Sequence, residues 1–130
     1  MESPEEIFGP VISSYSRAQA IEDGVLIDIT DLAKEAGFKF PVAVSVGVFE
    51  VLDLKVEGHG QSFDGRAWDM LAILLYEIRR GQAGERVDFA PLFVMPRDTT
   101  IRPRPVKMYA LCGPGDQGEP VITIMLPGED

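Results

Sequence analysis

Side chains that usually carry out covalent chemistry are sparse in this sequence. Its one histidine, His59, lies between two glycines in EGHGQS, and its one cysteine, Cys112, ends an apolar run. A zinc site needs several His, Cys or carboxylate ligands together, and a serine hydrolase needs a strained Gly-x-Ser-x-Gly turn. The sequence offers neither pattern, and a loop histidine and a buried structural thiol are more common than a catalytic Cys–His pair. We therefore expect no catalytic residue, no metal site and no cofactor.

A polar stretch near the N-terminus is the first candidate binding site. YSRAQAIEDG, residues 15–24, contains a tyrosine, an arginine and two acids. Ser16 and Gln19 have the spacing of a helix capping box, and Gly24 fits a left-handed helix stop. These assignments make the stretch mainly architectural, but they leave the other polar groups without a role. The alternative is a binding edge, which would consist of Tyr15, Arg17, Asp23 and Asp28.

A glycine-rich loop and a basic segment are the candidates for binding an anion. The loop GPGDQG could present backbone N–H groups as an anion-binding nest. It lacks a following Lys-Ser/Thr pair and precedes a strand, so it is neither a P-loop nor a dinucleotide fingerprint. Residues 97–107 hold the local positive cluster of the chain, and arginine forks suit phosphates and carboxylates. A hairpin turn and a solvated connection are the alternative interpretations. The candidate anion ligands are Arg97, Arg102, Arg104, Gly113, Gly115 and Asp116.

The charge balance argues against several classes of partner. The 130 residues hold 21 acidic and 12 basic side chains, which gives a formal net charge of −9. Such a chain lacks the basic face with which proteins bind phosphates, so we expect no binding to duplex DNA. It is equally unsuited to an anionic membrane surface, and no apolar run approaches the roughly 20 residues of a membrane span. With a single cysteine and no recognisable signal peptide, we expect a cytoplasmic protein.

Local patterns predict the elements that would position these residues. Val25 to Ile29 alternates as a short strand, and a second helix is expected to start at Thr30 and Asp31 and to end at Gly37. The clearest helix runs from Asp64 to Arg80, with one apolar stripe expected to face the core. The last third is expected to be β, including a hairpin around GPGDQGEP, and the final PGED is expected to be exposed. The apolar stripe consists of Trp68, Leu71, Leu74, Leu75 and Ile78.

Two long motifs resemble a known group of proteins. YSRAQAIEDGVLIDIT with EAGFKFPVAVS, and later CGPGDQGEPVITIMLPGED, resemble a family of short uncharacterised bacterial proteins often found among plasmid or other mobile-element genes. The resemblance runs from about Ile12 to Asp130 and implies no activity, cofactor or catalytic residue. It does bear on FPVAVSVGVFEVLDLKVE, where alternating valines favour a strand and the apolar spacing favours a helix. Because the family is more helical there, we favour a helix from Pro41 to about Leu54, with a strand as the alternative.

The expected fold is a single α+β domain over residues 1–130, with residues 1–13 as a loose arm. A small, mainly antiparallel sheet would carry three or four helices packed on one face. The expected function is that of a non-enzymatic accessory protein of a mobile element, acting by protein–protein binding. Its partner could be a host DNA-binding or defence protein that it inhibits or decoys. The alternative is a small ligand-binding module or enzyme that uses the loop Gly113–Gly118.

Overall fold

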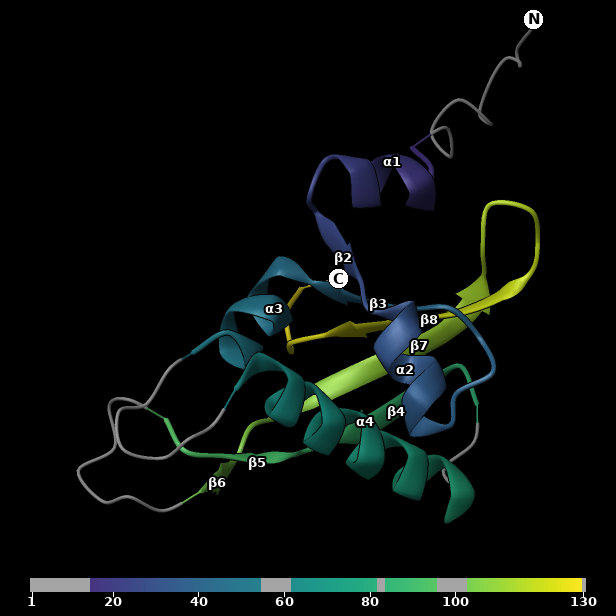
Figure 1. Cartoon of the computed structure of the whole chain (residues 1–130). Helices are drawn as coiled ribbons and strands as arrows, with labels where there is room; N and C mark the ends of the chain where they lie inside the picture. Colours follow the sequence, from purple (N-terminus) through teal and green to yellow (C-terminus); the bar gives the residue numbers. More distant parts are fainter. Residues whose placement is uncertain (1–14, 55–61, 82–83, 96–102, 130) are drawn as a thin grey trace, which may run out of the picture.

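The computed structural model describes residues 15–54, 62–81, 84–95 and 103–129 (Figure 1). Three of the residues considered above, His59, Arg97 and Arg102, lie outside these ranges. The helices and strands, in chain order, are α1 (Arg17–Glu22), β2 (Leu26–Asp28), α2 (Thr30–Ala36), β3 (Val42–Ser45), α3 (Val46–Leu52), α4 (Phe63–Arg79), β4 (Arg86–Phe89), β5 (Leu92–Phe93), β6 (Arg104–Pro105), β7 (Met108–Pro114) and β8 (Pro120–Met125).

A mixed five-stranded sheet forms the centre of the fold. Its strand order is β2-β3-β8-β7-β4, and strands β5 and β6 pair separately. Neighbouring strands of the large sheet are antiparallel except β3 and β8, which run parallel. Strands β7 and β8 form the expected hairpin around the glycine-rich loop. The prediction of an α+β fold with a mainly antiparallel sheet is therefore confirmed.

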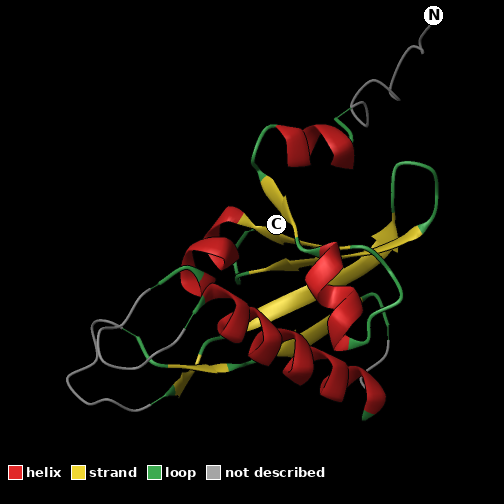
Figure 2. Cartoon of the chain, in the orientation of Figure 1, coloured by secondary structure: helices red, strands yellow, loops and turns green. Residues whose placement is uncertain are grey.

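Helices α2, α3 and α4 cover one face of the sheet (Figure 1 and Figure 2). The inward side chains of β3 and β8, such as Val44 and Ile124, are fully buried there. Helices α2, α3 and α4 close the core with residues such as Ala33, Val48 and Leu74, none of which is exposed. Helix α1 precedes β2 in the chain and lies at the N-terminal end of that strand, away from the other helices (Figure 1). No helix among the described residues is long and apolar enough to cross a bilayer.

The ambiguous stretch from Pro41 to Leu54 contains both kinds of element. Val42–Ser45 is a strand, and helix α3 begins at Val46, with the Ser45 hydroxyl accepting the Val48 N–H at 3.2 Å. The prediction of a helix from Pro41 is wrong for the strand and correct for the residues from Val46 to Leu52. Tertiary pairing decides the first half, because β3 lies between β2 and β8 and is buried at every position.

Pro127 and Gly128 of the C-terminal tail are exposed, as expected, whereas Glu129 folds back onto the start of α3 and Asp130 lies outside the described residues. The half-buried Glu129 carboxylate accepts hydrogen bonds from the Ser45 hydroxyl and from the Leu126 N–H, both at 2.7 Å. A side chain at position 47 would collide with the same carboxylate, so Gly47 permits the close approach.

Helix α4 matches the clearest sequence prediction within one residue at each end, and four residues of the predicted stripe face the core: Leu71 and Leu74 are fully buried, and Leu75 and Ile78 pack against the core. The fully buried positions include Ala67, Met70, Leu71 and Leu74, whereas Trp68 is 40% exposed. Successive residues of a helix are about 100° apart around its axis, so Trp68 points about 100° away from the buried Ala67. The expectation that Trp68 heads the core stripe is therefore wrong.

Cys112 is exposed, which corrects the expectation of a buried thiol. Because side chains alternate along a strand, Cys112 lies on the same face of β7 as the buried residues Met108 and Ala110. The hairpin extends past the covering helices at this end (Figure 1), so the thiol remains accessible.

Truncation of Leu71 should therefore be more damaging than truncation of Trp68. We expect Leu71→Ala to lower the free energy of unfolding by about 2–5 kcal/mol, the usual range for a fully buried leucine. Trp68→Ala should cost less than half as much, because much of its side chain already contacts water. Urea unfolding of the two variants measures both costs. Equal costs, or a folded-state tryptophan that acrylamide cannot quench, would place Trp68 in the core.

Candidate functional site

Helix α1 is built by the capping residues that the sequence predicted. The Ser16 hydroxyl accepts the Gln19 N–H at 3.0 Å, and the Ser16 N–H donates to the Gln19 side chain at 3.1 Å. Gly24 follows the helix with a left-handed φ of 79°. The Tyr15 hydroxyl donates to Asp23 at 3.0 Å, which ties the residue before the cap to the end of the helix. Two of the four candidate edge residues, Tyr15 and Asp23, thus bond to each other on the surface.

Arg17 anchors α1 to the face of the sheet opposite the core. Its guanidinium donates to the Thr123 hydroxyl at 2.6 Å and to the Ile122 carbonyl at 2.9 Å. Thr123 points away from the core because its neighbours on β8, Ile122 and Ile124, point into it. Burial lowers the pKa of Arg17, and the carboxylates of Asp28 and two hairpin acids oppose that effect. A side chain that the sequence left without a role therefore holds a helix in place.

Asp116 in the glycine-rich loop caps α1 from the other end of the chain. Its two carboxylate oxygens accept the backbone N–H groups of Arg17 at 2.7 Å and Ala18 at 3.0 Å. These hydrogen bonds hold the pKa of Asp116 below its ordinary value. The two motifs that looked most distinctive in the sequence are thus the two sides of one contact, which we call the α1–hairpin contact. Its residues are Arg17, Ala18, Asp116, Ile122 and Thr123.

The remaining acid of the candidate edge, Asp28, bonds to the first residue of the next helix. Its carboxylate accepts the Thr30 N–H at 3.0 Å and also the Thr30 hydroxyl. Asp28 is exposed and close enough to Arg17 to favour its charged form. The structure therefore brings Arg17, Asp28 and Asp116 together.

The glycine-rich loop donates its N–H groups mainly to itself. Gly115 N–H bonds to the Glu119 carbonyl at 2.6 Å, Gln117 N–H to the Glu119 carboxylate at 2.9 Å, and Gly118 N–H to the Gly115 carbonyl at 3.1 Å. Gly113 belongs to the end of β7. The Glu119 carboxylate thus takes up the Gln117 N–H, and the loop's own carbonyls take up those of Gly115 and Gly118, which an anion-binding nest would need free. Arg104 lies on β6, at the opposite end of the molecule from this loop (Figure 1).

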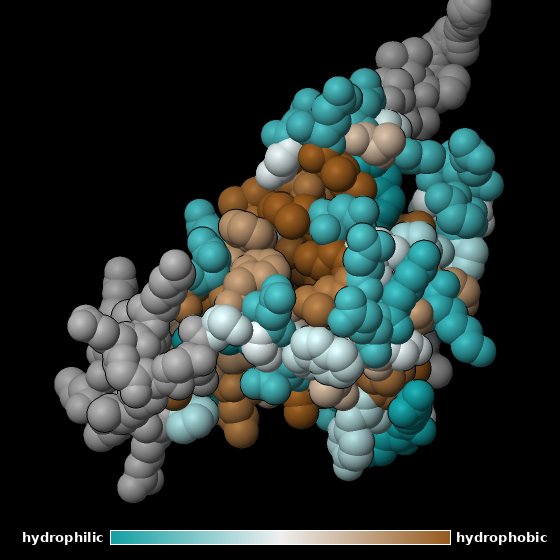
Figure 3. All heavy atoms as spheres, in the orientation of Figure 1, coloured by the Kyte–Doolittle hydropathy of each residue, from teal (hydrophilic) through white to brown (hydrophobic). Residues whose placement is uncertain are grey.

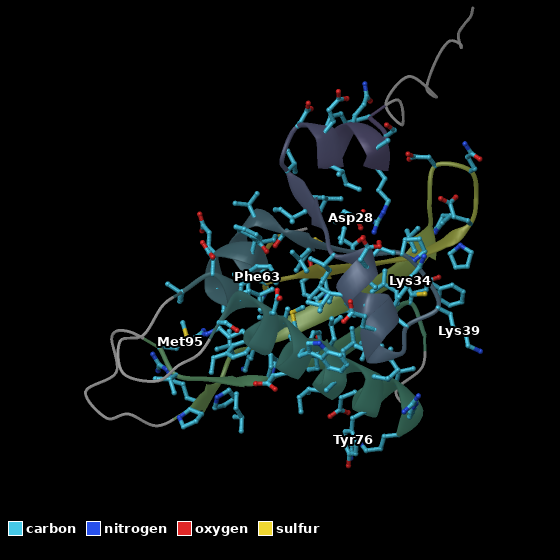
Figure 4. The ribbon with its side chains drawn as sticks, viewed as in Figure 1. Asp28, Lys34, Lys39, Phe63, Tyr76 and Met95 are labelled. Carbon is cyan, nitrogen blue, oxygen red and sulfur yellow. The ribbon has the colours of Figure 1, made fainter. Side chains whose placement is uncertain are left out.

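The outer surface of α4 is the feature that sequence reasoning missed. Trp68, Ile73 and Tyr76 are exposed there, and Tyr76 is 59% accessible and points away from the fold (Figure 4). The Arg80 guanidinium lies 5.9 Å from the Tyr76 ring centre. We call Trp68, Ile73, Tyr76 and Arg80 the α4 outer surface. The sequence did contain a signal for this surface, because Trp68 and Tyr76 are about two helical turns apart and form a second stripe beside the buried one.

A second apolar area lies over β2 and the start of α3. Figure 3 shows apolar side chains gathered there, below α1. Val25 and Val46 are the exposed members of this area. No group of three or more His, Cys, Asp or Glu side chains within the described ranges is arranged to hold a metal ion.

Removal of the Arg17 side chain should destabilise the protein. We expect Arg17→Ala to lower the free energy of unfolding by about 1–2 kcal/mol, since hydrogen bonds from a charged group stabilise by a few kcal/mol when buried and less when half-exposed. Lys39→Ala is the control, because Lys39 is exposed and makes no hydrogen bond to a described residue. Chemical denaturation checks the difference, and coincident midpoints for the two variants would contradict the anchoring role.

Asp116 should make stability depend on pH. Its folded-state pKa lies below the ordinary 3.8, so the ionised carboxylate stabilises the fold above about pH 4 and loses this effect as the pH falls through the folded value. Asp116→Asn should therefore have a lower urea midpoint than the parent at pH 7, with the gap closing as the medium is acidified. Asp69→Asn, an exposed carboxylate on α4, is the control. A gap that is independent of pH would show that the charge of Asp116 is not involved.

Comparison with known proteins gives one match. Neither the curated proteins nor the solved structures include a chain that matches this one. Residues 7–130, which include both sides of the α1–hairpin contact, match the family described as "Family of unknown function (DUF6573)". The chain therefore belongs to this family of unknown function.

Proposed function

We propose that this protein is a non-enzymatic accessory protein of a mobile element that acts by binding another protein. The observation that carries the proposal is the α4 outer surface, where a tryptophan, an isoleucine and a tyrosine are exposed on one rigid helix. Tryptophan, tyrosine and arginine are the residues that most often dominate binding energy at protein interfaces. An amphipathic helix that lies in a groove of its partner is a common mode of recognition.

The charge of the chain favours a basic partner. Asp64 and Asp69 are exposed on the same helix as the α4 outer surface, and the whole chain carries −9. Opposite charges on two surfaces speed their encounter and suppress wrong partners. A protein that binds DNA presents a basic surface to the phosphates, so we propose that the chain inhibits or decoys a host DNA-binding or defence protein in the cytoplasm.

The alternative function has less support. A ligand-binding module or enzyme at Gly113–Gly118 would need free backbone donors in that loop, whereas the described donors bond within the loop. Asp116, its most prominent polar side chain, is engaged with α1.

Affinity capture with matched variants tests the proposal. The immobilised parent should retain a basic host protein, and Trp68→Ser/Tyr76→Ser should lose it, because both side chains have 40% or more of their surface exposed for contact. Leu92→Ser/Leu111→Ser is the matched control, with exposures of 56% and 37% at sites outside α4. Equal capture by parent and surface variant would overturn the assignment to α4. Loss only in Val25→Ser/Val46→Ser would move the interface to β2.

A second measurement tests the decoy. Fluorescence anisotropy of a labelled duplex should show that the captured protein binds DNA and that the parent chain releases it. The chain alone should leave the anisotropy unchanged at physiological salt. If the captured protein has no affinity for DNA, the proposed decoy activity is contradicted, whereas the proposal that the chain binds another protein is not.

A further inference from the structure

A cavity opens between the helices and the sheet at the end where α4 finishes. It has a volume of about 490 Å³. Its walls come from the loop after α2, the last turns of α4, and strands β4, β7 and β8. Cavities of roughly 300–1,000 Å³ are the usual size for small-molecule sites, so this one suits a small ligand.

The interior of the cavity is apolar. Its walls include Phe38, Leu75, Ile78 and Val87, and the floor on the sheet is formed by Ala110 and Ile122. All six belong to the hydrophobic core or pack against it. A ligand with an apolar body would therefore continue the core of the protein outward, with a gain of about 25 cal/mol for each Å² of apolar surface removed from water.

The rim of the cavity is positively charged, in contrast to the chain as a whole. Lys39 and Arg79 line it, and no acidic side chain of the described residues does. Both cations are exposed, and Lys39 extends outward from the loop after α2 (Figure 4). Neither forms an ion pair with another described residue. In a chain with 21 acids and 12 bases, a cavity lined by two bases and no acid complements an anion.

We infer that this cavity binds an amphiphilic carboxylate, with its apolar body between α4 and the sheet and its carboxylate between Lys39 and Arg79. An arginine fork and a lysine ammonium are both suited to a carboxylate. The volume of about 490 Å³ leaves room for an alkyl body of the length of decanoate. This site shares no residue with the α4 outer surface and does not depend on the proposed function.

Cys112 gives a direct measurement of occupancy. Its thiol is exposed, lines the cavity and is the one cysteine of the chain. Decanoate is the probe, with decanol as the neutral analogue and decyltrimethylammonium as the cationic one. Decanoate should slow the reaction of Cys112 with Ellman's reagent in a saturable manner, and calorimetry should show one site. Decanol and the cationic analogue should protect at least tenfold less well.

Variants separate the charged rim from the apolar interior. Lys39→Gln/Arg79→Gln should weaken decanoate binding about tenfold, since two exposed ion pairs are lost. Cys112→Trp should abolish binding in calorimetry by filling the cavity, whereas Leu111→Trp, on the opposite face of the same strand, should leave it unchanged. Circular dichroism confirms that each variant is folded. The inference is overturned by absent binding, by equal affinity for decanol, or by a Cys112→Trp variant that still binds decanoate.

Discussion

The parallel pairing of β3 with β8 is the contact on which the rest of the fold depends. It joins residues 42–44 to residues 122–124, so it connects the first third of the chain to its last ten residues. Other contacts between the N-terminal region and distant parts of the chain lie beside this strand pair. Arg17 bonds to β8, Asp116 in the hairpin loop caps α1, and Glu129 bonds to the turn that leads from β3 into α3. Closing a loop of this length is costly in chain entropy, and these shared contacts offset the cost.

The most distinctive sequence motifs of the chain serve this closure. YSRAQAIEDG supplies the helix, and GPGDQGEP supplies the carboxylate that receives its first N–H groups. Their polar residues are engaged with each other, which explains why the motifs look functional and yet offer no open site. The surfaces that we propose for partners are elsewhere, on α4 and at the cavity beside its last turn. In this proposal, architecture and recognition occupy different parts of this small protein.

The charges around the two candidate surfaces complement different kinds of partner. The chain is strongly acidic, and the aromatic residues of α4 are accompanied by exposed acids, which suits a basic protein. The cavity has a basic rim and an apolar interior, which suits a small carboxylate. One helix contributes to both, with its outer side facing solvent and its C-terminal turn facing the cavity.

The sequence by itself determined the local features of this protein. The capping box of α1, the helix from Asp64, the glycine stops and the β hairpin are set by interactions within a few residues, and these predictions were correct. Only the tertiary structure decided which way each element faces. Val42 to Ser45 became a strand because β2 and β8 flank it, and on α4 the core takes Ala67, whereas Trp68 beside it is 40% exposed. The roles of Arg17 and Asp116 could not be predicted either, since about a hundred residues separate the atoms that meet.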